Sequence, residues 1–249
     1  MSGHSHWSGI KHKKAANDAK RGKLWSKIAR MIIVAAKNGG GDPAANLTLR
    51  YSIDKAKAAN MPKDTIEKAI KKGTGELGAI DYVEVLYEGY APGGVAIMVE
   101  GLTDNRNRTA PEIKKIFERR GGALGASGCV GWMFKKRGII AVKTTAIGED
   151  ELMDIALSSG ADDMQNAGEV YEITCAPEAY NGLKAALEAK KIPVENAEIS
   201  MIPDTTVEVA EQDVAHRILA MIDEFEDHDD VQEVYANFDI PDAILQKLQ

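Results

Sequence analysis

Lysine and arginine side chains that could bind phosphate groups are concentrated near the start of the chain. Nine Lys and Arg but only one acid occur in residues 1–37, which argues against a merely solvated helix face. At 3.6 residues per turn, four of them would fall within about 80° of one another on one helix face: Lys20, Lys23, Lys27 and Arg30. Cations in such a stripe could neutralise a nucleic-acid backbone and release its counterions. The binding residues predicted here are Lys11, Lys13, Lys14, Lys20, Arg21, Lys23, Lys27 and Arg30.

The polar segment that precedes the stripe contains an aromatic residue and three histidines. Trp7 would be able to stack on an exposed base. The alternative chemistry is metal binding by His4, His6 and His12, but no cysteine or carboxylate close to them completes a ligand set. We therefore predict no metal site and no cofactor.

A second polar cluster follows a predicted strand. Its candidate binding residues are Asn105, Arg106, Asn107 and Arg108. Asn and Arg suit bidentate contacts with phosphates, base edges or a 2′-hydroxyl. A turn held by internal Asn and Asp hydrogen bonds is the alternative for the asparagines. Ten basic and three acidic residues in the range 104–143 favour the binding interpretation.

No pattern in the chain indicates an enzyme. The glycine-rich stretch 121–131 lacks the Lys-Ser/Thr ending of a phosphate loop, so helix capping and close strand packing explain it better. The acidic run 223–230 lacks the spacing of a calcium loop, and we expect it to face away from any bound strand because it repels phosphates. No nucleophile with a supporting base is recognisable.

Charge and composition separate the chain into two parts. Residues 1–75 hold 16 Lys and Arg against 5 Asp and Glu, a net charge of +11, whereas the remaining residues sum to −18 and the whole chain to −7. No apolar run approaches the roughly 20 residues that span a bilayer. Because no apolar signal core follows the N-terminus and the two cysteines are far apart, we expect a cytoplasmic protein without disulfides.

Periodicity predicts an α+β fold with an N-terminal three-helix bundle and two ferredoxin-like α+β domains, one inserted in the other. Asp42 is the expected N-cap of the second helix, with Pro43 at its first position, and Thr109 the expected N-cap of a helix that ends near Arg120. Strands at 82–90 and 94–102 flank a turn, strands at 130–134 and 138–142 follow, and a βαβαβ unit is expected in the inserted domain. The predicted domains are 1–78, 79–134 with 205–249, and the insertion 135–204.

Four ordered segments of the chain resemble the YebC/PmpR family: GHSHWSGIKHKKAANDAKRGKLWSKIAR, NMPKDTIEKAIKKGTG, YEGYAPGGVAIMVEGLTDNRNRT and GGALGASGCVGWMFKKRG. The resemblance implies a cytoplasmic protein with a helical bundle and two α+β domains. Bacterial members are commonly described as DNA-binding transcriptional regulators, and mitochondrial relatives look like translational activators. We therefore predict a non-enzymatic, DNA-binding transcriptional regulator. The alternative is a translational activator that binds the ribosome or another structured RNA.

Overall fold

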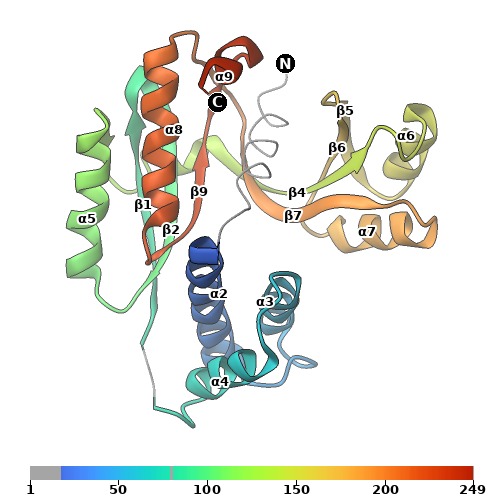
Figure 1. The fold of residues 1–249 in the computed structure, drawn as a ribbon. Helices are drawn as coiled ribbons and strands as arrows, with labels where there is room; N and C mark the ends of the chain where they lie inside the picture. Colours follow the sequence, from blue (N-terminus) through green and yellow to red (C-terminus); the bar gives the residue numbers. More distant parts are fainter. Residues whose placement is uncertain (1–17, 79–80, 249) are drawn as a thin grey trace.

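The N-terminal helices pack around an aliphatic core (Figure 1). The computed structural model describes residues 18–78 and 81–248. Ile28 and Ile32 lie four residues apart, so they share the face of α2 that packs on the two helices beside it, and both are almost fully buried. The helices are α2 (Asp18–Gly39), α3 (Leu47–Ala58) and α4 (Lys63–Gly73).

The start of α3 differs from the prediction. Asp42 accepts a hydrogen bond from the amide of Ala44 within a turn, and the N-cap of α3 is Asn46. The Asn46 oxygen accepts from the amide of Leu49 at 3.0 Å, while its side-chain nitrogen donates to the carbonyls of Ala35 (2.7 Å) and Gly40 (2.8 Å). This buried amide thereby ties the start of α3 to the end of α2, which an exposed Asp42 could not do.

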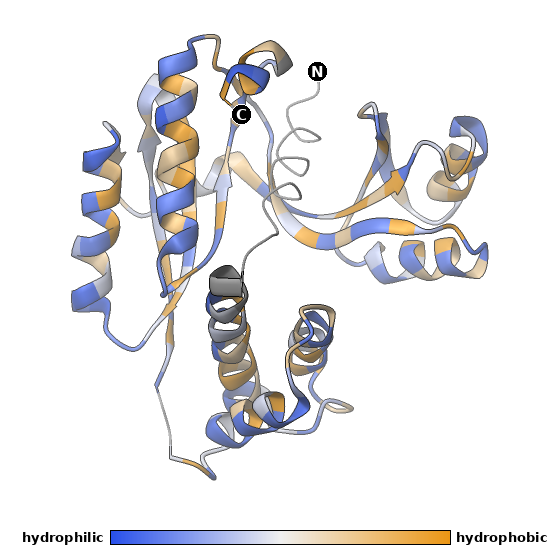
Figure 2. Cartoon of the chain, in the orientation of Figure 1, coloured by the Kyte–Doolittle hydropathy of each residue, from blue (hydrophilic) through white to orange (hydrophobic). Residues whose placement is uncertain are grey.

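A four-stranded antiparallel sheet forms the centre of the second part of the molecule, with the order β3-β1-β2-β9. The predicted hairpin is present as β1 and β2. Helices α5 and α8 lie side by side on one face of the sheet, where the rings of Phe117 and Phe225 meet edge to face at 4.9 Å. Figure 2 shows that both helices are amphipathic. The elements are β1 (Val83–Ala91), β2 (Val95–Thr103), α5 (Arg106–Arg119), β3 (Ala123–Leu124), α8 (Gln212–Asp227) and β9 (Val231–Ala236).

The inserted part has a second antiparallel sheet with the order β5-β6-β4-β7. Its chain order, βαββαβ, is that of a ferredoxin-like fold and corrects the predicted βαβαβ unit. A single strand, β4, replaces the two strands expected at 130–134 and 138–142. The elements are β4 (Phe134–Lys143), α6 (Glu149–Ser158), β5 (Ala161–Asn166), β6 (Val170–Cys175), α7 (Tyr180–Ala189) and β7 (Val194–Pro203).

Short elements complete the fold around the first sheet. β8 (Val207–Glu208) pairs in parallel with β10 (Phe238–Asp239), and α9 (Asp242–Leu248) follows. The larger elements around the first sheet follow the chain order ββαβαβ. This domain resembles the ferredoxin-like insertion in having an antiparallel sheet with helices on one face, but its chain order differs. The bundle, the first sheet and the inserted sheet each have a core, and a smaller fourth core joins the two sheets. The predicted domain limits stay a prediction. No helix in the described ranges is both long and apolar enough to span a membrane.

Replacing Asn46 by Ala should lower the free energy of unfolding by about 2 kcal/mol, because a helix cap and two buried hydrogen bonds are lost. Urea denaturation followed by circular dichroism measures the change. Asn38→Ala, at an exposed position of α2, is the matched control and should have almost no effect. Equal stability of the two variants would contradict the role given to Asn46.

Candidate nucleic-acid interface

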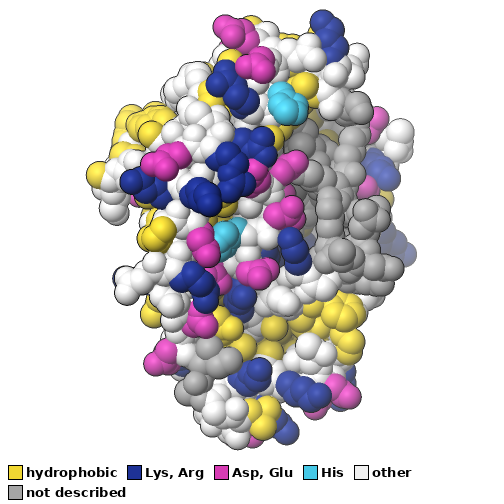
Figure 3. Space-filling model, turned by 60° about the vertical axis from the view of Figure 1, so that its left-hand side comes forward, with side chains coloured by type: hydrophobic (Ala, Val, Ile, Leu, Met, Phe, Trp, Pro, Cys, Tyr) yellow, Lys and Arg dark blue, Asp and Glu magenta, His cyan; other side chains and the backbone are white. Residues whose placement is uncertain are grey.

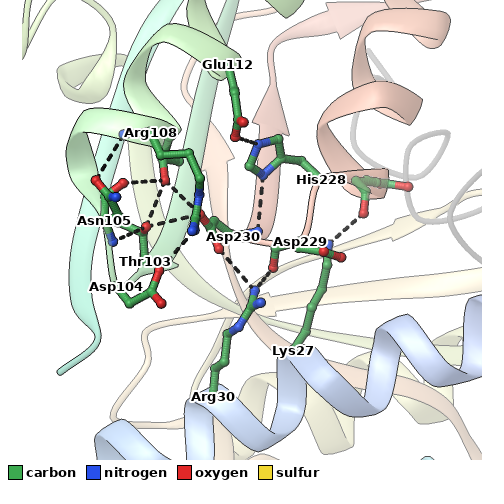
Figure 4. Close-up of polar contacts among 12 residues, drawn as sticks. Lys27, Arg30, Thr103, Asp104, Asn105, Arg108, Glu112, His228, Asp229 and Asp230 are labelled. Atoms are coloured by element: carbon green, nitrogen blue, oxygen red, sulfur yellow. Dashed lines mark hydrogen bonds and ion pairs between the residues drawn. The ribbon is translucent and has the colours of Figure 1, made fainter. Parts of the chain in front are cut away.

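The turn between α8 and β9 contains a buried carboxylate, Asp230, which is only 3% exposed. The hydroxyls of Thr103 and Thr109 lie 3.0 and 2.7 Å from its Oδ2 atom, and the Arg108 guanidinium lies 2.6 Å from the same oxygen. These partners come from the end of β2 and the first turns of α5 (Figure 4). Asp230 thus joins the α8–β9 turn to β2 and α5, which lie more than 120 residues earlier in the sequence.

Asp230 is held in its charged form. Burial alone would raise the pKa of this carboxyl, but hydrogen bonds from Thr109, Arg108 and Thr103 outweigh burial and lower the pKa below its ordinary value. The group is therefore ionised at neutral pH and attracts cations from neighbouring elements.

The basic stripe of α2 faces this turn. Arg30 Nη1 lies 3.4 Å from Asp230 Oδ1, and the guanidinium also donates to the carbonyl of Asp229. Lys27 Nζ donates to the carbonyl of Glu226 at 2.6 Å, and Lys23 Nζ donates to the carbonyl of Asp227 at 3.2 Å. The last carbonyls of a helix have no partner within the helix and carry partial negative charge. The cations of α2 therefore bind the end of α8 as well as its acidic side chains.

Lys27 is partly buried in this contact. Burial lowers the pKa of its ammonium group, and the carboxylates of Glu226, Glu233, Asp227 and Asp229 oppose that effect without cancelling it. The ammonium is therefore surrounded by protein acceptors and largely withdrawn from solvent.

The acidic run 223–230 contacts the predicted binding stripe itself, and the expectation that the run faces away from a bound strand stays a prediction. Opposite charge and unpaired helix carbonyls bring the two segments together across about 200 residues of chain. The assignment of Lys23, Lys27 and Arg30 to nucleic-acid binding stays a prediction.

The second predicted cluster is largely used within the fold. Asn105, and not Thr109, is the N-cap of α5, and its side chain accepts from the amide of Arg108 at 3.1 Å. Thr109 lies within the helix and binds Asp230 instead, which corrects the predicted capping box. Arg108 also pairs with Asp104 at 3.0 Å, and Arg106 donates to a backbone carbonyl of β1 at 3.1 Å. Only Asn107 is exposed without a hydrogen bond of its side chain to the described residues.

Several predicted residues lie outside what the structure describes. Lys20 and Arg21 belong to α2, but their side chains are not described. The others lie in residues 1–17: Lys11, Lys13, Lys14, Trp7, His4, His6 and His12. Within the described residues, no group of three or more His, Cys, Asp or Glu has the geometry of a metal site.

A cationic face on α4 was missed by the sequence analysis. Lys68, Lys71 and Lys72 lie at steps of three and four residues, so they share one face, and all three are exposed. None forms an ion pair with another described residue. The three- and four-residue spacing of these lysines in the sequence could have indicated this face. In Figure 3 several Lys and Arg side chains gather at the lower end, over the bundle, with some Asp and Glu side chains among them, and basic and acidic side chains alternate above.

The glycine-rich stretch forms an anion site that the chain fills itself. The buried carboxylate of Glu88 accepts from the amides of Gly128 (2.7 Å), Val130 (2.8 Å) and Gly131 (2.6 Å). Burial raises the pKa of this carboxyl, but the three backbone hydrogen bonds lower the pKa by a larger amount. The pKa therefore lies below its ordinary value. This stretch consequently has no free backbone cradle for a phosphate.

Replacing Asp230 by Asn should lower the free energy of unfolding by about 3 kcal/mol at pH 7, because the hydroxyls and guanidinium around it lose a charged acceptor. The folded pKa of Asp230 is depressed, so its contribution is present above the unfolded value of about 3.9 and lost as the pH falls through the folded value. The difference between wild type and variant should therefore shrink in acid. Urea titrations from pH 3 to pH 7 measure it, and a difference that does not depend on pH would contradict the ionised state.

Comparison with known proteins gives one consistent result. Residues 5–76 match the model of the TACO1/YebC protein N-terminal domain, and residues 82–238 match that of the TACO1/YebC second and third domain. Proteins named "Probable transcriptional regulatory protein" from Elusimicrobium minutum and Syntrophobacter fumaroxidans are 50% and 53% identical, covering all of this chain and 99% and 100% of theirs. The crystal structure of a conserved hypothetical protein from Aquifex aeolicus superposes with a TM-score of 0.84 at 49% identity and covers 97% of this chain and 99% of that one. The predicted α+β class and family resemblance are thus confirmed, and the chain belongs to the TACO1/YebC family.

Proposed function

We propose that this protein is a non-enzymatic regulator of gene expression in the cytoplasm that binds nucleic acid, with duplex DNA as its ligand. The observation that carries the proposal is the exposed face of Lys68, Lys71 and Lys72, which has no acidic partner among the described residues. It belongs to a bundle in which residues 18–78 hold 13 Lys and Arg against 6 Asp and Glu. Concentrated, unpaired positive charge is the electrostatic requirement for binding a phosphate backbone.

The names of the relatives support a regulatory role, since both relatives described above are called transcriptional regulatory proteins. The chemistry of the described residues agrees with binding and not with catalysis. The two most buried ionised carboxylates, Glu88 and Asp230, are fully engaged by backbone amides, hydroxyls and guanidinium groups. Neither has a free oxygen directed at a substrate.

The binding surface that we propose combines α4 with the preceding basic segment. Lys11, Lys13 and Lys14 would add charge to the lysines of α4, and Trp7 would stack on an unpaired base. In the second cluster, Asn105 and Arg108 serve the fold, which leaves Arg106 and Asn107 as candidates for a weaker contact. Backbone neutralisation alone does not distinguish duplex DNA from structured RNA, so a ribosome-associated role is the alternative.

Replacing Lys68, Lys71 and Lys72 together by Gln should weaken binding to a 20-base-pair duplex by about tenfold or more at 0.1 M salt. Because three phosphate contacts are lost, the slope of log affinity against log salt should become about 2.7 units less steep. Fluorescence anisotropy of a labelled duplex measures both quantities.

The matched control removes the same charge elsewhere, by changing Lys114, Lys190 and Lys247 to Gln. An equal loss of affinity in both triple variants would mean that only the net charge matters and would contradict the role of α4.

Ultraviolet crosslinking in cells then identifies the ligand. Discrete DNA sites would support the proposal, and recovery dominated by ribosomal or transfer RNA would replace it by the alternative.

A further inference from the structure

The surface of α2 that contacts the acidic turn has the features of a phosphate-binding site. Three cations of α2, Lys23, Lys27 and Arg30, each donate to a main-chain carbonyl of residues 226–229. We call residues 226–230 the acidic loop. The cations are spaced along one helix face and bind a row of oxygens from another segment. A phosphodiester backbone presents the same kind of row, with one charged group per nucleotide.

We propose that the acidic loop occupies this surface in competition with nucleic acid, so that a phosphate backbone binds α2 only when the bundle moves away from the loop. The inference rests on the proposed function and adds a form of regulation to it. In the closed arrangement described above, nucleic acid binds the lysines of α4 and the preceding basic segment without the α2 stripe. In the open arrangement the α2 stripe binds it as well.

The outer part of the contact is of a kind that ions can exchange, whereas the side chains of Arg30 and Asp230 are only 18% and 4% exposed. Lys23 and its partner Asp227 keep 48% and 66% of their side chains exposed at a separation of 3.6 Å. Exposed ion pairs contribute little free energy and are screened by salt. Other contacts of the bundle with the remaining chain are also polar, such as Lys55 with Glu233 at 2.8 Å and Tyr51 with Asn181 at 2.6 Å. An interface made mainly of such groups can separate without exposing a large apolar surface.

A route for the incoming phosphate lies beside the contact. A cleft of about 800 Å³ separates α2 from α5 at this turn. Its lining includes Lys23 and Arg30 from α2 and Lys115 and Arg119 from α5. Lys115 forms no ion pair with another described residue. Six carboxylates line the same cleft, so a phosphate group would reach these cations only as the loop moves away: Asp104, Glu112, Glu224, Asp227, Asp229 and Asp230.

The first test neutralises the loop without adding a cation, in the variant Asp227→Asn with Asp229→Asn. Both side chains are exposed, so the fold should be retained. Affinity for a 20-base-pair duplex should rise about threefold, because the closed arrangement loses an exposed ion pair and the attraction of two nearby carboxylates. The control variant Glu169→Gln with Glu188→Gln removes the same charge from the inserted part and should raise affinity much less.

A double-mutant cycle identifies the competing surface. In a background of Lys23→Gln with Lys27→Gln, neutralising the loop should raise affinity no more than the control does, since the stripe that the loop covers is gone. Circular dichroism checks that each variant is folded. The full wild-type gain in this background, or equal gains for loop and control in the wild type, would overturn the inference.

The second test measures opening directly. Dyes at Ala58→Cys in α3 and Glu118→Cys in α5, in a background of Cys129→Ser and Cys175→Ala, report the distance between bundle and sheet by energy transfer. Saturating duplex should lower the transfer efficiency, and the loop variant should already show a lower value without duplex. If wild-type protein binds the duplex with unchanged efficiency, the inference fails while the proposed function stands. If wild-type protein binds neither duplex nor structured RNA, the proposed function itself fails.

Discussion

The structure depends on one buried anion, the carboxylate of Asp230. Burying an unpaired carboxylate costs several kcal/mol, so its position is stable only if hydrogen bonds and opposite charges surround it. Thr103, Thr109 and Arg108 provide them from β2 and α5, and Arg30 adds a charge from α2. Because these partners come from three elements, β2, α5 and α2, satisfying this one group fixes the α8–β9 turn relative to the sheet and orients the bundle.

The positive charge of α2 has a structural use that the composition of the chain does not reveal. The helix α8 ends where Lys23, Lys27 and Arg30 approach, and its final carbonyls require donors. A capping residue within the loop could have supplied them locally. Here the donors come instead from a helix about 200 residues earlier, so the end of α8 and the position of the bundle depend on each other.

The sequence predicted elements well where apolar periodicity was strong and poorly where polar residues determined the outcome. The hairpin β1–β2 and the helices α4 and α8 follow directly from their apolar patterns. β5 was missed because the strand Ala161–Asn166 buries only Met164 and therefore has no alternating pattern. Asn46 and Asn105 were missed as N-caps because Asp42 and Thr109 fit the local rule, whereas the actual choice depends on Ala35 and Asp230, which are distant neighbours. The cations of α2 were recognised, but their partners in the acidic loop cannot be read from local spacing.

The chain fills two of its own anion sites, and their exposure separates a permanent contact from an exchangeable one. Glu88 is buried beneath the glycine-rich stretch, and its three amide donors lie at 2.6 to 2.8 Å, so no solvent anion could replace it without opening the core. Lys23 and Asp227 lie at the surface beside an open cleft, where water and salt already compete for both charges. A phosphate backbone carries many charges at fixed spacing and competes far better than a single ion. Of these two internal contacts, only the exposed one between Lys23 and Asp227 can therefore respond to a nucleic-acid ligand.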